Sequence, residues 1–170
     1  MARSMDSLII ARTDDLDAAV ALAREARLEV SASPEPPLAM WGAFDGDRMI
    51  ATVSLDVFGG LPVVGRIAVS RAYRGKGLGR RLLTALEKEA QRRGLTELWA
   101  TARAPDFFVS MGFSVVSDGP ERDLLLAECR ACAQYGTECR PQAVRKTYRA
   151  SAAPLTSRPG PAGLRRGGAY

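Results

Sequence analysis

The 170-residue sequence predicts an α/β (α+β) fold, a mixed and largely antiparallel sheet flanked by helices. Three observations support this prediction. Residues Val63 to Val69 form an apolar, β-branched run that is typical of a buried strand. A turn containing Gly75, Gly77 and Gly79 follows, and a strong helical pattern comes directly after it. Before this strand, an Asp-Gly pair joins two strand-like runs, which predicts an antiparallel hairpin.

The first part of the chain is predicted to contain a strand, a helix and the hairpin. A short strand over Ser7–Ala11 precedes apolar residues at helical spacing between Asp15 and Leu28. Three prolines between Val30 and Leu38 exclude a regular helix there, so that stretch is a loop. The hairpin strands run over Met40–Phe44 and Arg48–Phe58, and with the following strand they form a three-stranded meander.

The second part begins with the helix after the glycine turn, predicted over Gly79–Arg93. Its leucines share one stripe, and Gly94 ends it, as glycine commonly does at this position. Periodicity is weak between Val116 and Ala143, so no element is predicted there. The remaining elements are a strand over Leu95–Ala102, a short helix over Asp106–Met111, a strand from Gly112 and a last strand over Ala143–Arg149.

Composition places residues 1–149 in one globular domain and residues 150–170 in a flexible tail rich in Pro, Gly and Arg. The chain is 46% hydrophobic and 25% charged, which is usual for a globular protein. No apolar run reaches the roughly 20 residues of a membrane span, and no signal-peptide core is present. We therefore expect a cytoplasmic protein that does not bind membranes.

The net charge of +5 raises the question of whether the protein binds nucleic acid, and the answer depends on where the charge lies. Three of these charges come from Arg158, Arg165 and Arg166 in the tail, which contains no acid, so the domain itself is close to neutral. Nucleic-acid binders more often carry a basic face with interleaved aromatic residues. We therefore expect no nucleic-acid partner.

The glycine turn is suited to hold phosphate. It leads into a helix N-terminus, where main-chain N–H groups lack intrahelical partners and the helix dipole is positive. Glycines let a ligand approach the backbone closely. The spacing G-x-G-x-G fits neither a P-loop nor a dinucleotide fingerprint, and no Ser or Thr stands where a P-loop would bind Mg²⁺. A plain tight turn before a helix is the alternative.

The segment Arg74-Gly75-Lys76-Gly77-Leu78-Gly79 resembles the Q/R-x-x-G-x-G/A motif of the GNAT family of N-acetyltransferases. Ile67-Ala68-Val69 and Tyr73 before it also resemble that family, and DFFVSMGF further on resembles its F-Y/F-x-x-x-G-F segment. The likeness extends from Ser7 to Arg149. It implies a GNAT-like fold that transfers an acetyl group from acetyl-CoA to an amine by direct attack in a ternary complex.

The resemblance also implies which residues hold the co-substrate. Main-chain groups of the strand would pair with the pantetheine arm, the turn would bind the pyrophosphate, and the Val69 N–H would lie near the thioester carbonyl. The residues implied to bind acetyl-CoA are Ile67, Ala68, Val69, Arg74, Gly75, Lys76, Gly77, Leu78, Gly79 and Arg80.

The catalytic acid and base are not assigned by motif. The chain has no histidine, so the usual neutral-pH base is excluded. Asp56 and Glu97 are candidate bases beside the central strands, with surface carboxylates as the alternative. Many relatives carry Tyr where this sequence has Phe108, and phenylalanine cannot donate a proton. Solvent or Ser110 would then protonate the leaving thiolate.

Three cysteines, Cys129, Cys132 and Cys139, form a C-x₂-C-x₆-C pattern. This resembles the C-terminal cysteine segment of short N-acetylglutamate-synthase-like acetyltransferases. A structural zinc site wants four ligands, and three thiols without histidine fall short, so no metal is expected. Reduced thiols in a capping loop are the favoured interpretation, with a metal site or a redox-sensitive pair as the alternatives.

The acceptor is expected to be the amine of a small molecule, with an amino acid such as glutamate as one candidate. Arg66 and Arg103 are candidate carboxylate ligands. A xenobiotic amine, a protein amine and a non-catalytic acyl-CoA-binding module remain alternatives. Short glutamate synthases tend to carry an acid and an arginine where this sequence has Val64-Gly65-Arg66. The sequence leaves open the oligomeric state, including a homodimer built on exposed strands.

Overall fold

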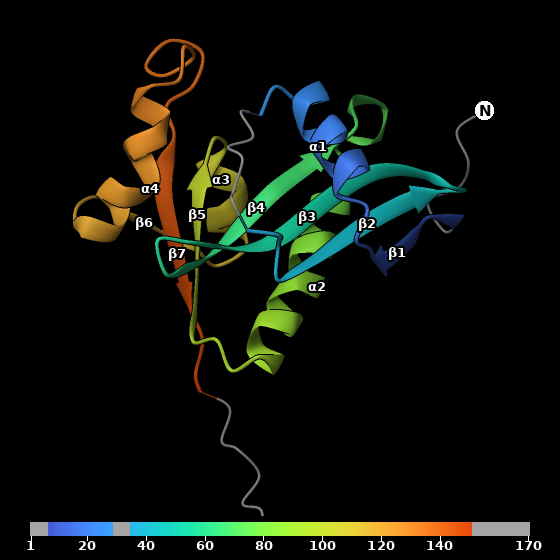
Figure 1. The fold of residues 1–170 in the computed structure, drawn as a ribbon, viewed down its shortest axis with the longest axis horizontal. Helices are drawn as coiled ribbons and strands as arrows, with labels where there is room; N and C mark the ends of the chain where they lie inside the picture. Colours follow the sequence, from blue (N-terminus) through green and yellow to red (C-terminus); the bar gives the residue numbers. More distant parts are fainter. Residues whose placement is uncertain (1–6, 29–34, 151–170) are drawn as a thin grey trace, which may run out of the picture.

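The computed structural model describes residues 7–28 and 35–150, and a seven-stranded sheet runs through them (Figure 1). The strand order is β1-β2-β3-β4-β5-β7-β6, and every neighbouring pair is antiparallel except β4 and β5. The sequence prediction of a mixed, largely antiparallel sheet flanked by helices is therefore confirmed.

The elements follow the predicted order with small changes at their ends. The first helix stops at Glu25 rather than Leu28. The predicted loop at 30–38 falls partly outside the described residues, and the predicted tail at 150–170 does so almost entirely. The strands are β1 (Ile9–Arg12), β2 (Ala39–Asp45), β3 (Arg48–Phe58), β4 (Leu61–Val69), β5 (Glu97–Ala102), β6 (Ser114–Val116) and β7 (Gln142–Thr147). The helices are α1 (Leu16–Glu25), α2 (Leu78–Arg92), α3 (Pro105–Ser110) and α4 (Pro120–Arg130), with a short 3-10 turn over Arg71–Tyr73.

Helices cover both faces of the sheet (Figure 1). On one face, the leucine stripe of α2 and Phe108 of α3 pack on Val53, Leu55 and Leu98 of the strands. On the other face, α1 packs on Met40, Met49 and Ala68, while α4 places Leu125 against Val63, Trp99 and Ala143. The first face is therefore closed by helices, whereas α1 and α4 cover separate parts of the second.

The meander β2-β3-β4 forms as predicted. Asp45 pairs with Arg48 across a two-residue turn in which Gly46 has a φ of 60°, a conformation that suits glycine. Strands β3 and β4 pair from Phe58↔Leu61 to Ala51↔Val69. Strand β4 then delivers the chain to the glycine turn at the upper end of the sheet.

Helix α4 was not predicted from the sequence. Its start signals are present, since Pro120 occupies the first turn and Glu121 and Asp123 place acidic charge there. The apolar signal is weak because Leu124, Leu125 and Leu126 are consecutive rather than spaced around the helix. Only the last two are buried, which shows that this helix depends on its contact with β5 and β7 for stability. No helix in the described residues is both long and apolar enough to cross a membrane.

A buried ionic network joins α2, β7 and the residue that follows α3. The Glu87 carboxylate, 7% exposed, lies 2.5 Å from the Lys146 Nζ and accepts a 2.6 Å hydrogen bond from the Tyr148 hydroxyl. Lys146 also donates to the Met111 carbonyl oxygen at 2.7 Å. Burial, together with the hydrogen bond to Glu87 and its negative charge, raises the pKa of Tyr148 far above its usual value. The network fixes the last strand against α2.

The raised pKa of Tyr148 predicts a specific dependence of stability on pH. The folded protein holds the phenol proton more tightly than the unfolded chain does, so this contribution is complete below about pH 10 and is lost as the pH rises further. We expect Tyr148→Phe to lower the free energy of unfolding by about 1.5 kcal/mol at pH 8, with a smaller deficit at pH 10.5. Urea unfolding of both proteins at the two pH values measures this, and a deficit that stays constant contradicts it.

Candidate functional site

The central feature of the site is the separation of β4 from β5. The register between them contains a single pair, Val63↔Trp99, and from there the two strands diverge (Figure 1). At the end of β4, the Ser70 N–H donates to the Ile50 carbonyl oxygen on β3 at 2.8 Å. Because main-chain groups of successive strand residues alternate in direction, those of Val69 face the open side of β4. The Val69 carbonyl accordingly accepts from the Arg74 Nε at 3.0 Å rather than from β3.

A β-bulge in β4 lies beside this opening. Thr52 pairs with Ala68, but Ser54 pairs with Gly65, so β4 contains one extra residue between these pairs. Arg66 adopts a φ of 43° within the bulge, which is unusual for a residue other than glycine. The bulge bends β4 where its main-chain groups become free for a ligand.

The glycine turn joins the open strand to α2, as the sequence predicted. Gly77 is the N-cap of α2 with a φ of 77°, and Gly75 has a φ of 71°. A Cβ at either position would meet nothing within 4 Å, so the backbone conformation, not crowding, requires glycine. The first N–H groups of α2 have no partners within the helix, and a helix N-terminus of this kind favours a bound anion.

A cleft of about 1210 Å³ lies over the open part of β4, between α1, α3 and α4. One end is lined by five of the residues expected to bind acetyl-CoA, which are Ile67, Ala68, Val69, Arg74 and Gly79. Arg71 also lines the cleft. The other expected residues lie in or just after the glycine turn. Among these, Leu78 is buried in the core, Lys76 lies over the Tyr73 ring, and the guanidinium of Arg80 donates to the Ser110 hydroxyl.

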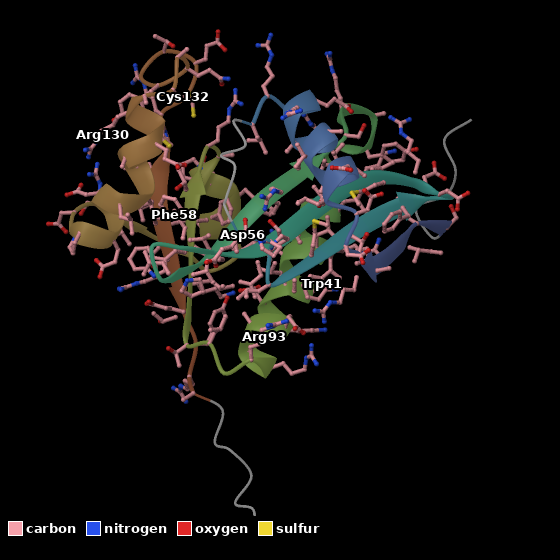
Figure 2. All side chains as sticks on the ribbon, viewed as in Figure 1. Trp41, Asp56, Phe58, Arg93, Arg130 and Cys132 are labelled. Atoms are coloured by element: carbon pink, nitrogen blue, oxygen red, sulfur yellow. The ribbon has the colours of Figure 1, made fainter. Side chains whose placement is uncertain are left out.

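Asp56 is the candidate base that the structure places in the cleft (Figure 2). Its carboxylate oxygens lie 3.0 and 3.1 Å from the Arg66 Nη1, and the Ser54 hydroxyl donates to the carboxylate at 3.2 Å. A Cβ at Gly65 would overlap this carboxylate, so glycine on β4 makes room for the acid from β3. Burial raises the pKa of Asp56, although the charge of Arg66 and both hydrogen bonds favour the ionised form.

The other candidate acid–base residues lie outside the cleft lining. Glu97 begins β5 and pairs with Thr147, two residues before the point where β4 and β5 meet. The Ser110 hydroxyl donates to the Phe107 carbonyl oxygen at 2.6 Å. Phe108 is 4% exposed and packs edge-to-face on Phe113, so it belongs to the core.

The opposite end of the cleft is lined by residues that no sequence motif marked individually. They are Glu25, Arg27 and Leu28 from the end of α1, and Leu125 and Glu128 from α4. Of the two expected carboxylate ligands, Arg103 lines this end, whereas the guanidinium of Arg66 is already engaged by Asp56. No sequence signal marked α4 as part of the site, because its helical pattern is weak.

The three cysteines line a smaller cavity of about 390 Å³ that adjoins this end, here called the thiol cavity (Figure 2 labels Cys132). All three are free thiols. Burial raises the pKa of Cys129, and the neighbouring Cys139, Cys132 and Glu128 add to the effect. Among residues 7–28 and 35–150, no group of three Cys, Asp or Glu side chains is placed to hold a metal ion.

Comparison with known protein families identifies this arrangement. Residues 9–113 match the Acetyltransferase (GNAT) family, which is more than half of the chain. The chain belongs to the GNAT acetyltransferase family. Members of this family are acetyl-CoA-dependent N-acetyltransferases, so acetyl-CoA is the co-substrate of this GNAT protein. No curated protein sequence matches it significantly.

Solved structures confirm the fold. An N-acetylglutamate synthase from Neisseria gonorrhoeae, complexed with coenzyme A and N-acetyl-glutamate, aligns with a TM-score of 0.62 at 19% identity, over 84% of this chain and 35% of its own. This GNAT chain thus spans about a third of that synthase. The Mycobacterium tuberculosis protein Rv2747, in complex with CoA, aligns with a TM-score of 0.60 at 16% identity, over 82% and 98% of the two chains. The ribosomal-protein-S18-alanine N-acetyltransferase of Escherichia coli aligns with a TM-score of 0.59 at 23% identity, over 88% of this chain and 97% of its own.

The glycine turn allows a matched test of CoA binding. Gly77 and Gly94 flank α2 with φ values of 77° and 76°, and a Cβ at either would meet no atom within 4 Å. Alanine at either position therefore strains the backbone by a similar amount, about 1–2 kcal/mol. We expect Gly77→Ala to weaken CoA binding about tenfold, because the N–H groups at the helix start no longer converge on phosphate. Calorimetric titration with CoA measures this.

The Gly94→Ala variant is the control, since it changes the same helix at the end remote from the turn. We expect its affinity for CoA to match that of the unmodified protein while its stability falls as much as that of Gly77→Ala. Equal losses of affinity in both variants would mean that the effect arises from stability alone.

Proposed function

We propose that this GNAT protein transfers an acetyl group from acetyl-CoA to the amine of a small molecule, by direct attack in a ternary complex. Amino acids, glutamate among them, are the first acceptors to consider. The observation that carries the proposal is one continuous cleft, which joins the open edge of β4 to a partly buried carboxylate, Asp56. A donor on β4 and an acceptor beside Asp56 would lie close together in it, and such proximity accelerates the reaction.

The donor end supports binding of an extended, anionic molecule. The main-chain groups of Ile67 and Val69 would pair with the pantetheine amides, much as a strand pairs with its neighbour. Arg74, which donates to the Val69 carbonyl in the structure, would exchange that contact for a phosphate oxygen. The start of α2 would hold the pyrophosphate through its N–H groups.

In the transfer step, the amine nitrogen attacks the thioester carbonyl carbon, an N–C bond forms and the C–S bond breaks. The Val69 N–H would donate to the carbonyl oxygen as negative charge develops on it. Asp56 accepts the proton that the acceptor ammonium must lose, directly or through one water molecule. The thiolate of CoA leaves and takes a proton from solvent, since Phe108 cannot donate one.

The proposed role of Asp56 predicts how activity depends on pH. Only the ionised carboxylate accepts a proton, so kcat/KM falls as the pH drops through the pKa of Asp56, which burial raises from its ordinary value. We expect Asp56→Asn to lower kcat/KM by a factor of about 10² to 10⁴ and to remove this acid limb. Rates of CoA release between pH 5 and 9 measure both effects.

Two further measurements separate this role from a structural one. Asp56→Asn leaves the Arg66 guanidinium without its buried partner, so the urea midpoint and the affinity for CoA must be measured alongside the rate. Glu97→Gln is the matched control, because this carboxylate lies on β5 of the same sheet, outside the cleft lining. An unchanged pH profile in Asp56→Asn would contradict the assignment of the base.

The reaction itself is tested with acetyl-CoA and a panel of amino acids, polyamines, aromatic amines and peptides. Release of the CoA thiol is the signal, and a blank without acceptor corrects for the three free cysteines of the protein. Release with a small amine supports the proposal. CoA binding without release for any amine would instead indicate a non-catalytic acyl-CoA-binding module, and release with peptides alone would indicate a protein amine as acceptor.

A further inference from the structure

Arg27 occupies a backbone position that normally belongs to glycine. Helix α1 ends with its C-cap at Ala26, after which the Arg27 N–H donates to the Arg24 carbonyl oxygen at 2.9 Å and the Leu28 N–H donates to that of Ala23 at 3.0 Å. This is the Schellman pattern, whose residue after the cap is left-handed and usually glycine. Arg27 has a φ of 57°, and such a conformation in a residue with a Cβ costs stability.

Contacts within the chain do not account for an arginine at this position. Its ion pair with Glu138 is 3.8 Å long, with side chains 75% and 62% exposed, and such pairs contribute little. The Arg103 Nη1 donates to the Arg27 carbonyl oxygen at 2.8 Å, but any residue at position 27 would offer this main-chain oxygen. Arg24 in the last turn already supplies a cation for the helix dipole. Strain that local contacts do not explain indicates a function.

The surroundings of the Arg27 side chain suggest what that function is. Arg27 and Arg103 both line the cleft and the thiol cavity, so they mark the junction between the two. The thiol cavity contains one lining carboxylate, Glu128, against these two guanidinium groups, and its three cysteines are free thiols. The junction therefore favours an anion, and the planar guanidinium group binds a carboxylate through two parallel hydrogen bonds.

We infer that Arg27, together with Arg103, binds the carboxylate of the acceptor and restricts the substrates to carboxylate-bearing amines. This inference rests on the proposed acetyl transfer. The acceptor amine would face Asp56, while its carboxylate lies at the junction and the remainder of the molecule extends toward the thiol cavity. Binding of an acceptor carboxylate would explain why this strained backbone position carries an arginine.

The test compares amino acids with their carboxamides, which keep the amine and the shape but lose the negative charge. We expect the unmodified protein to prefer the acids. Arg27→Gly should lower kcat/KM for the acids about 10- to 100-fold, mainly through KM, and leave kcat/KM for the amides within about twofold. The same variant should have a higher urea midpoint, because glycine relieves the strain. If Arg27 had only a structural role, its replacement would not be expected to raise stability and at the same time lower kcat/KM for the acids alone.

Two variants serve as controls. Arg24→Gln removes a positive charge from the same end of α1 but lines neither cavity, so both activities should remain unchanged. Arg27→Lys keeps the charge without the planar fork, so its preference for acids should lie between those of Arg27→Gly and the unmodified protein.

Four results would overturn the inference, and each has a different meaning. An equal decrease in kcat/KM for acids and amides in Arg27→Gly would show that Arg27 has a general structural role. A raised KM for acetyl-CoA with an unchanged acceptor KM would show that it binds a CoA phosphate instead. Preference of the unmodified protein for neutral amines would exclude a carboxylate ligand while leaving the proposed acetyl transfer intact. Absence of CoA release with every amine would contradict the proposed function itself, and the inference with it.

Discussion

The site depends on one constraint, the loss of pairing along one edge of β4. Main-chain N–H and C=O groups buried without partners are costly, so a strand that leaves its neighbour must have them satisfied by another group. On the β3 side, β4 is held by pairing along its length that only the bulge interrupts, with the Ser70 N–H fixed on Ile50. On the other side only Val63 meets β5. The fold thus presents a prepared strand edge that an extended ligand can complete, and this suits the amide-containing arm of CoA.

Strain in this protein is concentrated around the same cleft. Within residues 7–28 and 35–150, the two residues other than glycine with positive φ are Arg27 and Arg66, and both line it. Arg66 is held by its ion pair with Asp56, and Gly65 beside it removes the Cβ that would block the carboxylate. The bulge therefore serves two purposes, since it turns main-chain groups toward the cleft and positions an acid above them. Such compensated strain is characteristic of functional sites.

Short glutamate synthases tend to carry an acid and an arginine where this chain has Val64-Gly65-Arg66. In this chain a carboxylate lies beside that segment from another strand, since Asp56 on β3 occupies the space that Gly65 leaves open. Arg66 neutralises it in place, and burial still keeps its pKa raised. A motif comparison along β4 alone misses this arrangement, because the two residues lie on different strands and meet only through the register of the sheet.

Local sequence was sufficient for the strand, glycine turn and helix between Val63 and Gly94. Each of these elements is specified by neighbouring residues: a β-branched run, glycines at positive φ, and an apolar stripe of period 3.6. The hairpin and the order of strands along the chain followed from equally local signals. Helix α4 did not, since its consecutive leucines become a core only when they pack on Val63 and Trp99.

Only the tertiary structure decided which polar residues share the cleft. Asp56 enters it while Glu97 and Ser110 stay outside, and Arg66 is engaged by an acid ten residues earlier in the chain. Arg27 gave no signal at all, because its significance lies in a backbone angle and in a cavity formed by α1, β5 and α4 together. Chemistry between distant residues depends on strand register and helix docking, and these are set by the packing of the whole domain rather than by any local pattern.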